Sequence, residues 1–130
     1  MRAVTGTDIC HIEWTVTGPK CVLLLVHGLG AHALRWSAMA EFFMRNGISS
    51  YAVELHDHDN EGRKIDRPES FKEYYDKILR LSEIASRENP SKKIFLVGES
   101  MGALISFLLS VSHPEISSGL VCISPAFATK

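Results

Sequence analysis

Cysteine is scarce in this 130-residue sequence, and its placement excludes two kinds of small domain. The three cysteines are Cys10, Cys21 and Cys122. Their number is odd and no two of them form a CxxC pair, which argues against a disulfide framework and against a zinc site. Cys21 and Cys122 fall in apolar runs, where buried free thiols are common. We therefore expect a reducing, cytoplasmic setting.

The sequence also lacks a long apolar run and a surplus of basic residues. The longest clean apolar run, residues 21–26, is far shorter than the roughly 20 residues that span a bilayer. No apolar segment follows Met1, so we expect neither a signal peptide nor a transmembrane segment. The 14 Lys and Arg against 15 Asp and Glu give a net charge of −1, which argues against nucleic acid as a partner.

Short apolar runs alternate with amphipathic segments along the chain. Two strands come first, and three helix–strand pairs follow them. The alternation predicts an α/β fold in which a mostly parallel central sheet carries flanking helices on both faces. The length allows one domain, residues 1–130, with a modest core. The predicted strands are residues 9–16, 21–26, 48–55, 93–97 and 120–124, and the predicted helices are residues 34–45, 71–88 and 103–112.

Side-chain periodicity gives more specific placements. On the first strand, His11 and Glu13 alternate with apolar residues, so His11 is expected to point outward. At the start of the second helix, Ser70 and Glu73 form a capping-box pattern. The inner face of the first helix is predicted to hold Trp36, Met39, Ala40 and Phe43. The inner face of the second is predicted to hold Phe71, Tyr75, Ile78 and Ala85.

Residues 98–102 read Gly-Glu-Ser-Met-Gly, a G-x-S-x-G motif centred on Ser100. The motif follows a predicted strand and opens an apolar helix, which is the context of a serine nucleophile on a sharp strand-to-helix turn. So sharp a turn strains its central residue, and side chains at the two glycines would collide with neighbouring elements. We predict Ser100 as a nucleophile. The alternative is a glycine-rich turn of a nucleotide-binding or structural protein, which this context disfavours.

A second glycine-rich segment, residues 27–30, leaves the 21–26 strand. In the hydrolase arrangement, this loop and the residue after the nucleophile each donate a backbone N–H to the oxyanion, and here the donors would be Leu29 and Met101. Gly28 and Gly30 let the main chain approach a substrate closely. His32 is expected at the mouth of the site. The alternative, a plain glycine turn, is disfavoured because the 98–102 motif accompanies it.

These segments resemble the monoacylglycerol lipases and lysophospholipase-like serine hydrolases of the α/β-hydrolase superfamily. Residues 27–32, with Arg35 and Trp36 beyond them, look like the oxyanion segment of that family. Further landmarks keep the family's order, among them Asn89-Pro90 before the motif. The resemblance covers nearly the whole chain and the N-terminal half of the family's domain. It implies hydrolysis of monoacylglycerols, lysolipids or small carboxylesters by a Ser–Asp–His triad without a cofactor.

Two positions depart from the family's pattern. Relatives usually carry a Gly-His-Gly-type turn where Asp57 and Asp59 flank His58 in this chain. Relatives also most often carry His where this chain has Glu99, directly before the serine. Together with His56, the first cluster could indicate a metal site. We favour a solvated polar loop and no bound metal, because no third anchored ligand stands out.

The expected triad is incomplete in this sequence. In this fold an acid and then a histidine follow the serine, but the only such residues after Ser100 are His113 and Glu115. They lie beyond the predicted 103–112 helix, whose ten residues are about 15 Å long. His27 is expected to order the glycine loop instead of acting as the base. We therefore expect a fragment or truncated product with weak or no turnover by itself.

The incomplete sheet allows another function. The strand at residues 120–124 would form an open edge, through which a non-catalytic half-domain could pair with another chain or with a second copy of itself. A nucleotide-binding protein is less well supported, because neither a G-x-G-x-x-G nor a Walker pattern follows the first buried strand.

Overall fold

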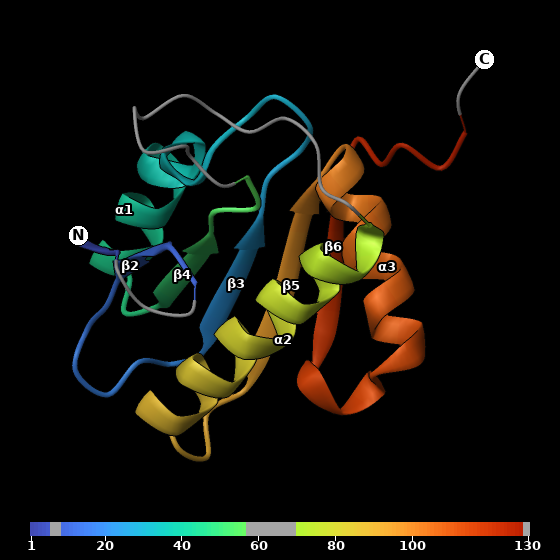
Figure 1. Cartoon of the computed structure of the whole chain (residues 1–130). Coiled ribbons are helices and arrows are strands. Elements are labelled where there is room, and N and C mark those ends of the chain that lie inside the picture. Colours follow the sequence, from blue (N-terminus) through green and yellow to red (C-terminus); the bar gives the residue numbers. More distant parts are fainter. Residues whose placement is uncertain (6–8, 57–69, 129–130) are drawn as a thin grey trace.

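The computed structural model describes residues 1–5, 9–56 and 70–128, and the statements that follow concern those residues. Their strands form one sheet in the order β1-β2-β4-β3-β5-β6 (Figure 1). The strands are β1 (Arg2–Val4), β2 (His11–Trp14), β3 (Val22–Val26), β4 (Ser49–Val53), β5 (Ile94–Glu99) and β6 (Gly119–Ile123). The helices are η1 (Ala33–Trp36), α1 (Ser37–Arg45), α2 (Phe71–Glu88), α3 (Met101–Ser112) and η2 (Pro114–Ile116).

The prediction of an α/β fold with a mostly parallel sheet is confirmed. Strand β3 pairs in parallel with β4 and β5, and β5 pairs in parallel with β6. Strand β2 is antiparallel to both β1 and β4. The short elements β1, η1 and η2 were not predicted, and the first predicted strand, residues 9–16, is only four residues long as β2.

The continuous apolar run of β3 reflects burial on both faces of the sheet. Val22, Leu24 and Val26 belong to one core cluster, whereas Leu23 and Leu25 belong to the other. Successive side chains of a strand point to opposite faces, so a strand covered on both sides must be apolar throughout. All five residues of β3 are buried.

Helices α2 and α3 cover one face of the sheet, and η1 with α1 covers the other (Figure 1). The prediction for the first helix is confirmed, since its four inner residues all belong to the α1-side cluster or pack against it. The buried apolar side chains that α2 and α3 place against the sheet are Tyr74, Ile78, Leu81, Ala85, Ile105 and Leu109.

Two predictions at the start of α2 are wrong. Phe71 is 50% exposed, because it is the first residue of the helix and contacts the edge of the Tyr74 ring at the end of the core. The other inner-face predictions are confirmed: Tyr75 is partly buried and packs against the core beside the buried Tyr74, and Ile78 and Ala85 are buried. The capping box is absent. Ser70 makes no side-chain cap hydrogen bond, and the backbone N–H of Glu73 donates to the Ser70 carbonyl instead.

The outward orientation predicted for His11 is also wrong. His11 and Glu13 are each only 3% exposed. Glu13 pairs in register with Tyr51 of β4, whose side chain lies in the α2-side core, so this face of β2 is covered. Trp14 on the opposite face is buried as well. Alternation therefore showed which residues share a face but could not show that both faces are covered.

Strand β6 lies at one edge of the sheet, as predicted, and β1 lies at the other. Val121 pairs in register with Val97, which belongs to the α1-side core, yet Val121 is 49% exposed. Cys122 on the same strand is partly exposed, as is Cys21 before β3, so the expected burial of both thiols is incomplete. In the described part of the chain, no helix has the length and apolar character needed to cross a membrane.

Candidate functional site

Ser100 occupies the single-residue junction between β5 and α3. Its backbone has φ 55° and ψ −119°, in the left-handed half of conformational space that favours glycine. Four hydrogen bonds hold this strained backbone. The Ser100 N–H donates to the Ile123 carbonyl at 3.0 Å. The Ser100 carbonyl accepts from the N–H groups of Ala103 at 3.1 Å and of Leu104 and Ala126, each at 3.2 Å. The side chain that results is exposed.

The two glycines of the motif lie where no side chain fits. A Cβ atom on Gly98 would be 2.4 Å from the Gly102 carbonyl oxygen. A Cβ atom on Gly102 would be 2.3 Å from the carbonyl oxygen of Val26 and 2.5 Å from that of His27. These are backbone atoms of packed elements, which cannot move aside cheaply. The steric reason predicted for both glycines is therefore confirmed.

Residues 28–32 form a loop that runs directly past Ser100. A Cβ atom on Gly28 would lie 3.1 Å from the Ser100 Cβ and 3.6 Å from its Oγ, and Gly30 adopts a φ of 73°. This loop and the 98–102 turn line an open cavity of about 540 Å³. Met101 follows Ser100 directly and opens α3. The lining residues are Gly28, Leu29, Gly30, Ala31, His32, Arg35, Glu99 and Ser100.

His27 orders this loop from beneath, as expected. It is fully buried. Its Nδ1 donates to the Gly28 carbonyl oxygen at 2.8 Å, and its Nε2 lies 3.1 Å from the Leu55 backbone nitrogen. Glu54, which the sequence did not single out, lies 3.0 Å from the same Nε2 and accepts the Ala33 N–H at 3.0 Å. The carboxylate therefore joins the end of β4 to the loop and to η1.

The expectation that His56 belongs to a solvated loop is wrong. His56 is 2% exposed, and its ring centroid lies 5.3 Å from that of His27 and 5.9 Å from that of Tyr74. The neighbouring residues 57–59, including His58, lie outside the described residues. Among the described residues, no group of three or more His, Cys, Asp or Glu side chains could hold a metal ion.

A charged pair stands beside Ser100. Both carboxylate oxygens of Glu99 accept hydrogen bonds from the guanidinium of Arg35, which lies on η1 just beyond the loop. The hydrogen bonds and charge of Arg35 lower the pKa of the Glu99 carboxyl group. Glu99 is therefore ionised at neutral pH, and its charge is balanced within the wall of the cavity.

The histidine and the acid that follow Ser100 in the sequence lie at the other end of α3. Ser100 is the residue before α3 and His113 the residue after it. The 12 residues of α3 separate the two by about 18 Å. His113 Nδ1 instead lies 2.9 Å from the Ser112 hydroxyl, and Glu115 lies in η2. Neither can take a proton from Ser100.

Comparison with known proteins agrees with this geometry. Residues 17–130 match the model of a hydrolase family described as serine aminopeptidase S33. The chain belongs to this α/β-hydrolase family. Its similarity to the monoacylglycerol lipases within the superfamily, predicted from the 27–32 and 98–102 segments, is confirmed.

Two curated relatives are lipases by name. This hydrolase chain is 31% identical over 124 residues to the monoacylglycerol lipase of Mycolicibacterium smegmatis, covering 95% of the chain and 44% of the relative. It is 32% identical over 116 residues to the monoglyceride lipase of Mus musculus, covering 86% of the chain and 37% of the relative. The chain thus spans less than half the length of these relatives.

Solved structures agree. The Paleococcus ferrophilus monoacylglycerol lipase superimposes with a TM-score of 0.77 at 26% identity, covering 95% of this chain and 45% of that one. A thermostable carboxyl esterase from Bacillus coagulans, solved with glycerol, also gives a TM-score of 0.77, covering 94% of this chain and 42% of that one. Its identity is 22%, so it supports the fold alone.

Substitution Gly102→Ala should destabilise the protein by about 3 kcal/mol, because the added methyl group meets fixed carbonyl oxygens. Gly18→Ala is the matched control. Gly18 has a φ of 61° but nothing within 4 Å of an added Cβ, so it should lose only about 1 kcal/mol. Urea unfolding followed by circular dichroism measures both. Equal losses would contradict the steric argument.

The pair between Glu99 and Arg35 should stabilise the protein in a pH-dependent way. Because the folded-state pKa of Glu99 is lowered from 4.5, its stabilisation is complete above 4.5 and is lost as the pH falls through the lowered value. Wild type should therefore exceed Glu99→Gln in free energy of unfolding at pH 7, with the difference shrinking by pH 3. Glu41→Gln, which removes a looser 3.7 Å pair with Arg45, should show little difference at either pH.

Proposed function

We propose that this protein is a serine hydrolase that cleaves carboxylic ester bonds with Ser100 as the nucleophile. The observation that supports this most strongly is the strained backbone of Ser100, which presents the side chain at the wall of a cavity of about 540 Å³. Strain of this kind persists where the surrounding structure enforces it, and it is concentrated at functional sites. Membership of a hydrolase family supports the same function.

In the proposed reaction, the Ser100 Oγ attacks the carbonyl carbon of the ester and passes its proton to a general base. The electron pair of the C=O bond moves to the oxygen, which binds the backbone N–H groups of Leu29 and Met101. The Met101 N–H lies in the first turn of α3, where it has no acceptor within the helix and carries partial positive charge. Collapse of the intermediate breaks the ester C–O bond, and the leaving alcohol takes the proton from the protonated base. Water then hydrolyses the acyl-enzyme, which releases the carboxylic acid and restores Ser100.

The base and the acid of this reaction would come from further polypeptide. His27 is held in the hydrogen bonds of the loop, and His113 is at the far end of α3. In this fold the order along the chain is serine, acid, histidine. We therefore expect residues 1–130 alone to turn over substrate weakly or not at all, and no step requires a cofactor.

The substrate class that we propose is a monoacylglycerol, a lysolipid or a small carboxylester. The named monoacylglycerol lipases among the relatives support the first of these. Gly28 and Gly30 leave room for the substrate beside Ser100, and the exposed His32 lies at the mouth of the cavity. A cytoplasmic setting is part of the proposal, because the cysteine pattern argues against a disulfide framework.

A fluorophosphonate probe should label the full-length protein at Ser100. Labelling should be lost in Ser100→Ala and kept in Ser112→Ala, which removes a hydroxyl at the other end of α3. Mass spectrometry of the labelled peptide locates the probe. No label at Ser100 in the full-length protein would end the hydrolase proposal. Robust p-nitrophenyl butyrate hydrolysis by residues 1–130, lost in Ser100→Ala, would show that the chain already contains its base.

We also propose a second function for residues 1–130, that of a half-domain which pairs with further polypeptide through β6. The strand lies at the edge of the sheet, and Val121 and Ile123 on it are 49% and 37% exposed. Phe107 and Phe127 nearby are also exposed, and their rings meet edge to face with centroids 5.3 Å apart. An uncovered edge with apolar side chains is a template for another strand.

If β6 pairs between copies, residues 1–130 should form a species heavier than the 14.4 kDa monomer. Val121→Lys should return it to the monomer, because a charge on an edge strand opposes pairing. Phe42→Lys, at a 60% exposed site on α1, should leave the mass unchanged. Size-exclusion chromatography with light scattering measures all three. A soluble wild-type monomer at every concentration would count against the pairing.

A further inference from the structure

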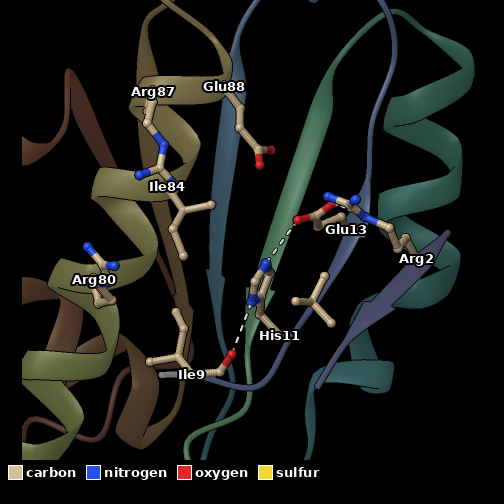
Figure 2. Close-up of a pocket in the computed structure, with 9 residues that line it drawn as sticks. Arg2, Ile9, His11, Glu13, Arg80, Ile84, Arg87 and Glu88 are labelled. Carbon is tan, nitrogen blue, oxygen red and sulfur yellow. Dashed lines mark hydrogen bonds and ion pairs between the residues drawn. The ribbon is translucent and has the colours of Figure 1, made fainter. Parts of the chain in front are cut away.

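A second cavity, of about 400 Å³, lies between strands β1 and β2 and helix α2. Figure 2 shows Arg2, His11 and Glu13 on its strand side and Arg80, Ile84 and Arg87 on its helix side. None of its lining residues lines the cavity beside Ser100. Whatever this pocket binds is therefore separate from the proposed ester hydrolysis.

The strand side of the pocket is a buried polar wall. Glu13 accepts hydrogen bonds from Arg2 Nε at 2.8 Å and from His11 Nε2 at 2.9 Å. Glu13 and His11 are each 97% buried, so the Glu13 carboxylate is costly unless paired. Arg2 supplies that pairing from the outside, with a side chain that is 66% exposed. Glu13 therefore does not present an unbalanced negative charge to the pocket.

The helix side of the pocket carries two arginines. Arg80, Ile84 and Arg87 are spaced i, i+4 and i+7, which places them on one face of α2. Arg80 donates to the exposed Glu83 at 2.7 Å. Arg87 has no acidic partner among the residues that the structure describes. The N–H groups of the Arg87 guanidinium can therefore donate hydrogen bonds to a ligand.

The lining offers one cation without a partner. Three arginines and two carboxylates, Glu13 and Glu88, line the pocket. Arg2 is paired with Glu13 and Arg80 with Glu83, so Arg87 is the lining arginine that has no acidic partner among the described residues. Glu88 also accepts the hydroxyl hydrogen bond of Tyr51 at 2.8 Å. The apolar part of the lining is Val4, Ile9 and Ile84.

We propose that this pocket binds a small amphipathic carboxylate. Its head would accept hydrogen bonds from the forked donors of Arg87, because a guanidinium matches a carboxylate in shape and charge. Its short apolar body would contact Ile84, Ile9 and Val4. The volume lies within the range of small-molecule sites. The inference holds whether or not Ser100 is a nucleophile.

Titration of the 15N-labelled full chain with hexanoate tests this site. We expect saturable shift changes at residues 2–13 and 80–88, with a dissociation constant on the order of 1 mM. Hexan-1-ol and inorganic phosphate should each bind at least about tenfold more weakly, since one lacks the charge and the other the apolar body. Hexylamine should not bind.

Charge variants give the sharpest control, because they should act in opposite directions. Arg87→Gln should weaken hexanoate binding about fivefold, and Glu88→Gln, which keeps an acceptor for Tyr51, should strengthen it about threefold. Arg45→Gln on α1, 75% exposed and outside the pocket, should change nothing. No saturation, shifts confined to the cavity beside Ser100, equal binding of phosphate, or equal affinity in Arg87→Gln and Glu88→Gln would each overturn the proposal.

Discussion

The contact between the first turn of α3 and the end of β3 is the constraint on which the candidate site depends. Gly102 lies so close to the Val26 and His27 carbonyls that a methyl group would not fit between them. Because α3 starts against β3, the 28–32 loop that leaves β3 has to pass Ser100 at contact distance. The cavity therefore results from backbone packing at Gly102. The side chains around it, Arg35 and Glu99 included, only modify its shape.

Much of the fold could be predicted because local pattern and tertiary environment agree. The apolar run of β3 indicates a strand buried on both faces, and the G-x-S-x-G segment indicates a sharp strand-to-helix turn. In both segments the local geometry and the packing favour the same structure. The failures share a different cause. The burial of His11 depends on the strands that flank it, since it pairs in register with Val4 of β1 and Val53 of β4, and the exposure of Phe71 depends on where the core ends. Periodicity contains neither fact, since it describes one segment at a time.

The same distinction applies to the site. Most residues that line the cavity beside Ser100 could be predicted, because they belong to two short motifs that are each continuous in the sequence. Two contacts were missed, the one that Glu54 makes beneath the loop and the one between Arg35 and Glu99, and both join residues far apart in the sequence. Glu54 lies 27 residues from His27, and Arg35 lies 64 residues from Glu99. Such pairs become visible only when the sheet order brings the ends of neighbouring strands together.

The backbone hydrogen bonds of Ser100 have a consequence for how the protein is made. Two of them reach more than 20 residues forward in the sequence, to Ile123 and Ala126. A ribosome releases residues from the N-terminus onward, so the strand before the serine emerges well ahead of these partners. The left-handed turn at Ser100 can therefore be locked only after β6 has joined the sheet. Until then the nascent chain lacks two of the four backbone hydrogen bonds that hold the turn at Ser100.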